Sequence, residues 1–167
     1  MTITPNKESS KIPFLEPIDF EKLVDSKLSK PARYMGHELG VKPHEWDIAK
    51  VRWALTYPEL YEVGSSNLGH IILYSILNVV PNQLCDRAYL PAEDLSIRLR
   101  QRKQPLFAVE SRRPLKAFDV LGFSLSYELG ATNILEMLDL AHIPLYSYDR
   151  GDLSLNDPNS PPLIFAG

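Results

Sequence analysis

The chain has 167 residues, 44% of them hydrophobic, which is enough for one domain with a hydrophobic core and too few for two domains of ordinary size. A formal net charge of -3 excludes a global attraction to nucleic acid or to an anionic membrane surface. The single cysteine, Cys85, excludes an intramolecular disulfide and any metal site built from several thiolates, as is usual in the reducing cytosol. The sequence contains neither a signal peptide nor the run of about 18 apolar residues that a membrane span needs, so we expect a cytoplasmic protein.

Residues 1–30 are expected to be a flexible leader that contains one short helix. Its first 17 residues combine three prolines with several polar residues and show no hydrophobic periodicity. Asp19 can cap a short helix that ends before Pro31. Two interpretations of the irregular residues 31–46 stay open: a surface loop wrapped on the domain, or a segment that reaches a partner.

Beyond this point, strands and helices alternate. The run from Val120 to Leu125 is almost entirely apolar, which is typical of a strand covered on both faces at the centre of a sheet. An amphipathic helix follows it, for which Thr132 or Asn133 is the expected cap. The other strands are expected at 51–57, 87–90, 143–146 and 163–165, with an edge strand or ribbon at 106–109; the other helices are expected at 70–80 and after Pro91.

This alternation predicts an α/β fold with an open, doubly wound, mainly parallel sheet of Rossmann-like or flavodoxin-like type over residues 31–167. The flavodoxin-like strand order 2-1-3-4-5 would put the strand at 51 beside the strand at 119. A ligand crevice is then expected outside the carboxyl ends of these two strands. Because the sequence stops with its last strand, without the helix that would cover it, we expect a truncated domain.

Polar and small residues of the two loops at those strand ends are the candidate crevice residues. Free amides between Gly64 and Gly69 can bind an anion, but the lysine of a P-loop is missing; the alternative is a turn in which Ser65 or Ser66 caps the helix. Glu62 and Glu128 can act as paired carboxylates in acid/base chemistry or as turn residues. The crevice residues are Tyr61, Glu62, Gly64, Ser66, Asn67, Ser126, Tyr127, Glu128, Thr132 and Asn133.

Cations gather between residues 98 and 116. They form either a solvated helix face with its loop or a patch that binds nucleic acid or a protein partner. The four histidines show no ligand spacing, so no metal site is predicted. The patch residues are Arg98, Arg100, Arg102, Lys103, Arg112, Arg113 and Lys116.

Four stretches of the sequence are familiar: RYMGHELG at 33–40, YPELYEVGSSNLGHIILYSILN at 57–78, PLFAVESRRPL at 105–115 and FDVLGFSLSYELGATNILEMLDLAHIPL at 118–145. Together they resemble the N-terminal, cobalamin-binding-like domain of a family of large radical S-adenosylmethionine (SAM) proteins. The resemblance implies a Rossmann-like fold that precedes a radical SAM barrel, whose [4Fe-4S] cluster is held by a CxxxCxxC motif. This chain lacks the motif and is not expected to be catalytic by itself.

The resemblance also implies cofactors and a partner. S-adenosylmethionine and the [4Fe-4S] cluster belong to the complete family protein, and no cofactor is expected in this chain. Cobalamin is implied as well, although the DxHxxG signature of one class of cobalamin-binding domains is absent. We therefore expect a non-catalytic accessory domain whose crevice faces the barrel, in the same polypeptide or on a separate chain. Two alternatives stay open: a stand-alone flavodoxin-type binder of a small ligand, and a nucleic-acid or partner-binding module that uses the cations at 98–116.

Overall fold

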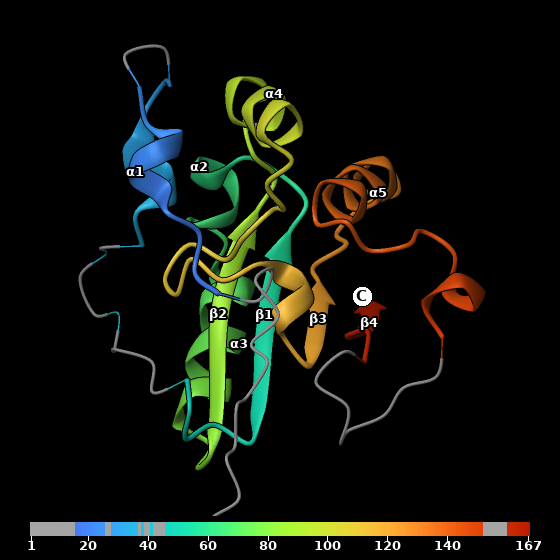
Figure 1. Cartoon of the computed structure of the whole chain (residues 1–167). Helices are drawn as coiled ribbons and strands as arrows, with labels where there is room; N and C mark the ends of the chain where they lie inside the picture. Colours follow the sequence, from blue (N-terminus) through green and yellow to red (C-terminus); the bar gives the residue numbers. More distant parts are fainter. Residues whose placement is uncertain (1–15, 26–27, 37, 39–40, 42–45, 152–159) are drawn as a thin grey trace, which may run out of the picture.

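The computed structural model describes residues 16–25, 28–36, 38, 41, 46–151 and 160–167. Its centre is a four-stranded parallel sheet in the order β2-β1-β3-β4 (Figure 1). The strands are β1 (Val51–Tyr57), β2 (Gln83–Tyr89), β3 (Val120–Phe123) and β4 (Leu163–Ala166). The α/β fold with a doubly wound parallel sheet is confirmed, and the strand at 51 does lie beside the strand at 120.

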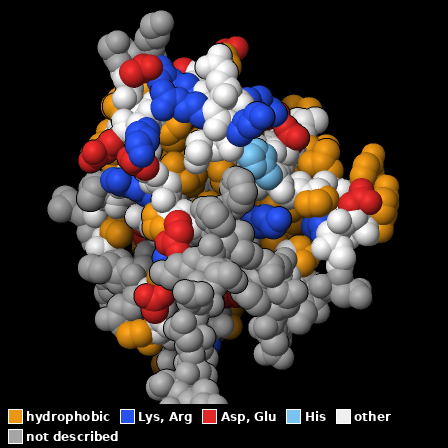
Figure 2. Space-filling view, viewed as in Figure 1, with side chains coloured by type: hydrophobic (Ala, Val, Ile, Leu, Met, Phe, Trp, Pro, Cys, Tyr) orange, Lys and Arg blue, Asp and Glu red, His pale blue; other side chains and the backbone are white. Residues whose placement is uncertain are grey.

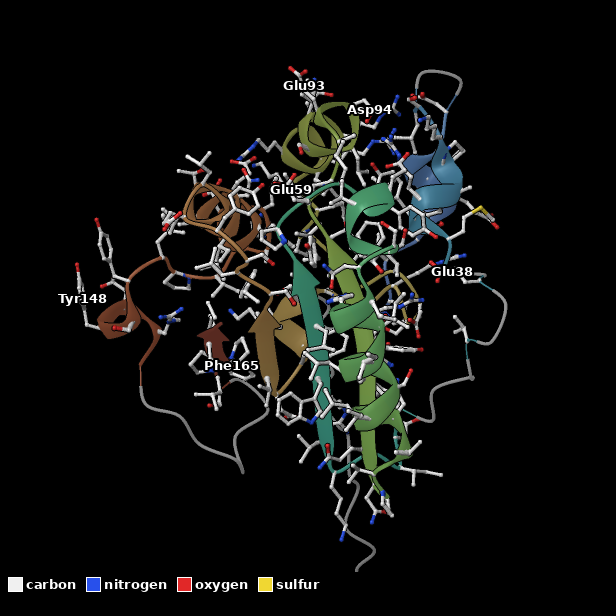
Figure 3. The ribbon with its side chains drawn as sticks, turned by 180° about the vertical axis from the view of Figure 1, so that it is seen from behind. Glu38, Glu59, Glu93, Asp94, Tyr148 and Phe165 are labelled. Atoms are coloured by element: carbon white, nitrogen blue, oxygen red, sulfur yellow. The ribbon has the colours of Figure 1, made fainter. Side chains whose placement is uncertain are left out.

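Helices cover both faces of the sheet. They are α1 (Phe20–Leu23), α2 (Tyr61–Gly64), α3 (Leu68–Val79), α4 (Glu93–Arg102) and α5 (Gly130–Leu140), with short 3-10 helices η2 (Pro31–Tyr34), η3 (Leu115–Ala117) and η4 (Ser147–Arg150). Seen from behind, α3 runs in front of β1 and β2 (Figure 3), whereas α1, α4 and α5 pack on the opposite face. None of the described helices has the length and apolar character needed to cross a membrane.

The main hydrophobic core lies on the face of the sheet opposite α3. Side chains alternate between the two faces of a strand, so Ala54 of β1 and Ala88 of β2 point into this core, while Tyr57 and Tyr89 point towards α3. Residues from all three helices on this side, and from the loop before β3, fill it. They include Phe20, Leu23, Leu95, Leu99, Leu106, Phe107, Leu115, Leu121, Met137, Leu138 and Leu140.

Part of the predicted leader belongs to this core. Ile18, Phe20, Leu23 and Leu28 are all buried, and the ring of Phe20 meets the edge of Phe107 at a centroid distance of 6.0 Å. Residues 1–15, the remainder of the leader, lie outside the described residues. The residues just before Pro31 therefore help to cover the sheet.

Three predicted strands differ from the observed ones. β2 begins at Gln83, four residues earlier than expected, because Asp86 interrupts the apolar pattern although it lies buried inside the strand. Residues 143–146 form no strand: His142 adopts a left-handed conformation (φ 55°), so the chain turns after α5. The expected edge strand at 106–109 is reduced to one antiparallel bridge between Phe107 and Pro114.

Candidate functional site

The two predicted crevice loops meet at the carboxyl ends of β1 and β3. Figure 3 shows Glu59 at this end of the sheet, where the Tyr127 hydroxyl donates a hydrogen bond to its carboxylate. From the second loop, the Asn133 side-chain amide donates to the Pro58 carbonyl at 2.8 Å. The structure therefore brings Tyr127 and Asn133 against the first loop. Both contacts are hydrogen bonds within the domain.

Other crevice residues hold the helix starts. Asn67 caps α3, because its Oδ1 accepts from the His70 backbone N–H at 2.9 Å, so the expected capping by Ser65 or Ser66 was wrong. The Ser66 hydroxyl instead donates to backbone carbonyls within α2 at 3.0 Å. Capping of α5 by Thr132 or Asn133 was also wrong, because the helix already begins at Gly130 and has no side-chain cap.

Glu62, one of the two predicted paired carboxylates, forms ion pairs with cations of the N-terminal segment. Glu62 lies 2.7 Å from the Arg33 guanidinium and 3.4 Å from the Lys30 ammonium. Hydrogen bonding from Arg33 lowers the pKa of Glu62, which keeps this carboxylate ionised. Ser126 and Glu128 are exposed on the second loop, and the described part of the structure shows no ion pair or hydrogen bond that would join Glu128 to Glu62.

Gly64 closes the first loop tightly against the sheet. A Cβ atom at this position would lie 2.5 Å from the Tyr89 ring, so only glycine fits here without displacing that ring. The neighbouring Tyr61 ring packs edge-on against Tyr89 at 5.2 Å. The Tyr61 hydroxyl donates to Glu38 at 2.5 Å, which ties the loop to the irregular segment before β1. Burial, together with the nearby Glu38 carboxylate, raises the pKa of Tyr61 to about 12.

A buried ionic network, which was not predicted from the sequence, lies beneath these loops. Arg87, on β2, lies 2.7 Å from Glu38 and 2.8 Å from Glu110, and its guanidinium stacks 4.6 Å from the centre of the Tyr74 ring. The Tyr74 hydroxyl also donates to Glu110, at 2.9 Å. This network joins four separate parts of the chain: Glu38, Tyr74 of α3, Arg87 of β2 and Glu110. Its one sequence signal is a charged pair, Asp86 and Arg87, inside an otherwise apolar strand.

Asp86 points to the other side of β2 and fixes the loop that carries Glu110. Its carboxylate accepts from the backbone N–H groups of Arg87, Glu110 and Ser111 at 2.6 to 3.1 Å. Gly36 packs against the same loop in a left-handed conformation (φ 64°), where a Cβ atom would lie 2.3 Å from the Val109 carbonyl oxygen. Both contacts position Glu38 and Glu110 around Arg87.

The inward face of α3 is polar. His70, Tyr74 and Asn78 follow one another at four-residue spacing and therefore share one face of the helix. Along β2 they contact Tyr89, Arg87 and Cys85 in turn, and we call these three pairs the polar ladder. The His70 and Tyr89 rings lie 5.8 Å apart, and Arg87 makes a cation–π contact with Tyr74 at 4.6 Å. The Asn78 side chain makes two hydrogen bonds to the Cys85 backbone at 2.9 Å. One helix turn thus spans two residues of the strand.

The outward face of α3 is apolar. Five large side chains are 48% to 73% exposed, and the helix contains no charged residue. We call Leu68, Ile72, Leu73, Ile76 and Val79 the outer α3 face. A surface helix of a soluble domain normally has the opposite arrangement, with polar residues outward. Exposed apolar surfaces of this kind are typical of sites that contact a protein, a membrane or a ligand.

Most cations of the predicted basic patch contact other groups of the domain. Arg98 is buried and pairs with Asp25 at 2.5 Å, and Arg100 bridges Glu136 and Asp139 on α5. Figure 2 shows Lys and Arg interspersed with Asp and Glu over the upper part of this face. Arg102 donates to the Lys22 carbonyl, Arg112 lies over Phe20, Arg113 lies over Trp46, Lys103 ends α4 and Lys116 lies in η3. Nucleic-acid binding by these cations stays a prediction.

His70 gives the domain a predictable dependence on pH. Burial, followed by the nearby charge of Arg87, lowers the pKa of His70 to about 4. The unfolded chain, with a histidine pKa of about 6.5, therefore binds the proton more readily than the folded domain. The free energy of unfolding should fall by about 1.5 kcal/mol between pH 6.5 and pH 5 from this side chain alone. Urea unfolding at the two pH values measures the loss.

Two histidine variants test this origin. His70→Gln should lack most of the loss between pH 6.5 and pH 5, whereas His142→Gln, at an exposed turn, should retain it. An equal pH dependence in wild type and His70→Gln would show that other groups cause it.

The cysteine content of the chain does not fit the [4Fe-4S] cluster of radical SAM chemistry. A CxxxCxxC site needs three thiolates, but the chain has one cysteine, which is buried, and burial raises the pKa of its thiol. No group of three potential metal ligands occurs among the described side chains. Of the two described histidines, His70 lies on the buried face of α3. His142 lines a hollow with Arg100 and Asp139 at the end of α5.

The fold and the site define a class of protein: a doubly wound α/β domain in which several crevice side chains bond to neighbouring groups of the domain and the outer α3 face is apolar. Residues 69–167, well over half of the chain, match the family described as the N-terminal region of radical SAM proteins. The chain belongs to this family. The match carries no specificity for cobalamin. No curated protein and no solved structure matches the chain.

Proposed function

We propose that this chain is a non-catalytic accessory domain that docks onto the radical SAM barrel of the complete protein. Family membership supplies the partner, since radical SAM proteins combine this N-terminal region with a catalytic part. The outer α3 face is the observation that carries the proposal, because it offers an uncharged apolar surface on an otherwise charged domain. The cluster and S-adenosylmethionine then belong to the barrel.

The crevice end of the sheet extends this docking surface. α3 starts there with Leu68, and the neighbouring Val63 of α2 is 49% exposed. On the second crevice loop, Tyr127 and Leu129 are also exposed. We propose that the barrel covers these side chains together with the outer α3 face. Cobalamin is not part of the proposal, because the family match carries no specificity for it and three crevice side chains, Asn67, Tyr127 and Asn133, already bond to Tyr57, Glu59 and Pro58 of the domain.

Replacing Ile76 by glutamate tests the docking surface. Ile76 lies at the middle of the outer α3 face, where a buried, unpaired carboxylate would oppose association. We expect this variant to bind the radical SAM barrel, produced as a separate chain, at least about tenfold more weakly than wild type. Isothermal titration calorimetry measures the dissociation constants.

The matched control is Ile97→Glu. Ile97 is similarly exposed, at 46% against 53% for Ile76, but belongs to α4 on the other face of the sheet. Its variant should bind like wild type, and circular dichroism should show that both variants are folded. Wild-type affinity in Ile76→Glu would rule out this surface, and an unmodified chain that does not bind the barrel would rule out the proposed function.

A further inference from the structure

Three buried polar atoms in the described part of the chain have no hydrogen-bond partner. They are His70 Nε2, Arg87 Nη2 and the Tyr89 hydroxyl, on residues that are 1% to 4% exposed. Nearly all buried polar atoms in folded proteins bind either another protein group or an ordered water molecule. His70 and Tyr89 are in ring contact, and Arg87 lies two residues before Tyr89 on β2, so the three exceptions lie in one region and suggest one shared cause.

All three side chains lie between α3, which carries His70, and β2, which carries Arg87 and Tyr89. The His70 and Tyr89 rings lie 5.8 Å apart and are tilted by 55°, so they do not fill this space by stacking. Arg87 and Tyr89 are two residues apart on β2 and therefore share the face that meets α3. The charge of Arg87 also reaches His70, where it helps to lower the pKa of the imidazole.

The remaining polar atoms of His70 and Arg87 are already engaged. Nδ1 of His70 lies 3.4 Å from the Ser124 hydroxyl, and Nε and Nη1 of Arg87 hold Glu110 and Glu38. The unpartnered atoms are thus those left over once the ionic network and the Ser124 contact have formed. They offer one obligate donor, Arg87 Nη2, and two groups that can accept.

We propose that one buried water molecule lies between α3 and β2 and bridges these three atoms. It accepts a hydrogen bond from Arg87 Nη2 and donates one to His70 Nε2, in the tautomer whose Nδ1–H faces Ser124. The Tyr89 hydroxyl makes the third bond, which is the usual number for a buried water. The local groups favour a neutral molecule: an anion would be repelled by the two carboxylates, Glu38 and Glu110, that surround the single Arg87, and a cation cannot accept the hydrogen bond that Arg87 Nη2 offers.

This water completes the polar ladder. Two of the three rungs, Tyr74 with Arg87 and Asn78 with Cys85, are direct contacts. In the rung nearest the crevice, the rings of His70 and Tyr89 meet without a hydrogen bond between them. The water supplies the missing polar link, so it joins the first turn of α3 to the end of β2.

A crystal structure of the full chain at a resolution that shows ordered solvent is the direct test. A water within hydrogen-bond distance of at least two of the three atoms supports the proposal. An empty space, a water that reaches only one of the atoms, or a direct hydrogen bond among the three side chains would overturn it.

The sign of a stability change gives a second test, in solution. If the Tyr89 hydroxyl is bound to water, Tyr89→Phe removes a hydrogen bond and should lower the equilibrium constant for folding about threefold to tenfold. Tyr34→Phe is the control, because the buried Tyr34 hydroxyl has an observed partner, the Ala92 N–H at 3.1 Å, and should show a loss of similar size. An unchanged or raised constant for Tyr89→Phe in urea unfolding would contradict the bound water.

Discussion

Replacing Arg87 by methionine is expected to lower the free energy of unfolding by about 3–5 kcal/mol, which is the usual cost of removing one partner from a buried ion pair. Arg87 is 4% exposed and holds Glu110, whose side chain is 3% exposed, at 2.8 Å. Glu110 would keep its hydrogen bond from Tyr74 but lose the cation that balances its charge. Methionine fills a space similar to that of arginine, so the loss in free energy of unfolding reflects mainly the removed charge. Urea unfolding at pH 7 measures it.

Two further variants separate the ionic network from general effects of losing an arginine. Arg100→Met removes two ion pairs at the surface, where all partners are 43% to 53% exposed, and should cost no more than about 1 kcal/mol. Adding Glu110→Gln to Arg87→Met should recover part of the stability, because the carboxylate left without its cation is removed. Equal losses in Arg87→Met and Arg100→Met would mean that the buried network is not a major source of stability.

Truncation of Leu138 to alanine is expected to cost about 2–5 kcal/mol, because it leaves a cavity in the main core. Leu138 is 4% exposed on the side of α5 that faces the sheet. Leu135 on the same helix is 48% exposed, and Leu135→Ala should cost no more than about 1 kcal/mol. Thermal and urea unfolding of both variants measure the difference. Similar losses at both positions would show that burial of Leu138 in the main core does not determine the effect.

The sheet could be predicted because its signal is local. β1 and β3 are short apolar runs followed by turns, and helices of the right length separate the strands, which favours a parallel sheet. β2 was misplaced because the buried charges of Asp86 and Arg87 are balanced by residues far away in sequence. The partners Glu38 and Glu110 lie 49 and 23 residues from Arg87, and no local pattern indicates such pairing.

The meeting of the two crevice loops could also be predicted, whereas ligand binding between them stays a prediction. The rule that ligands bind where the strand order reverses identified the two loops that meet. It could not identify which atoms bind, since the contact between Asn133 and Pro58 joins residues 75 positions apart. The orientation of α3 was beyond the sequence as well. Apolar side chains surround this helix on most sides, so its pattern does not tell which face is buried, and contacts with Tyr89 and Arg87 decide the matter.

The inverted arrangement of α3 also has a consequence for the order of assembly in the cell. The polar ladder needs only residues of this domain, so α3 can dock on β2 before the barrel has folded. If the barrel covers the outer α3 face as proposed, this apolar surface stays exposed to water from that moment until docking. On the proposed interface, the length of this interval would set how long the domain is open to aggregation.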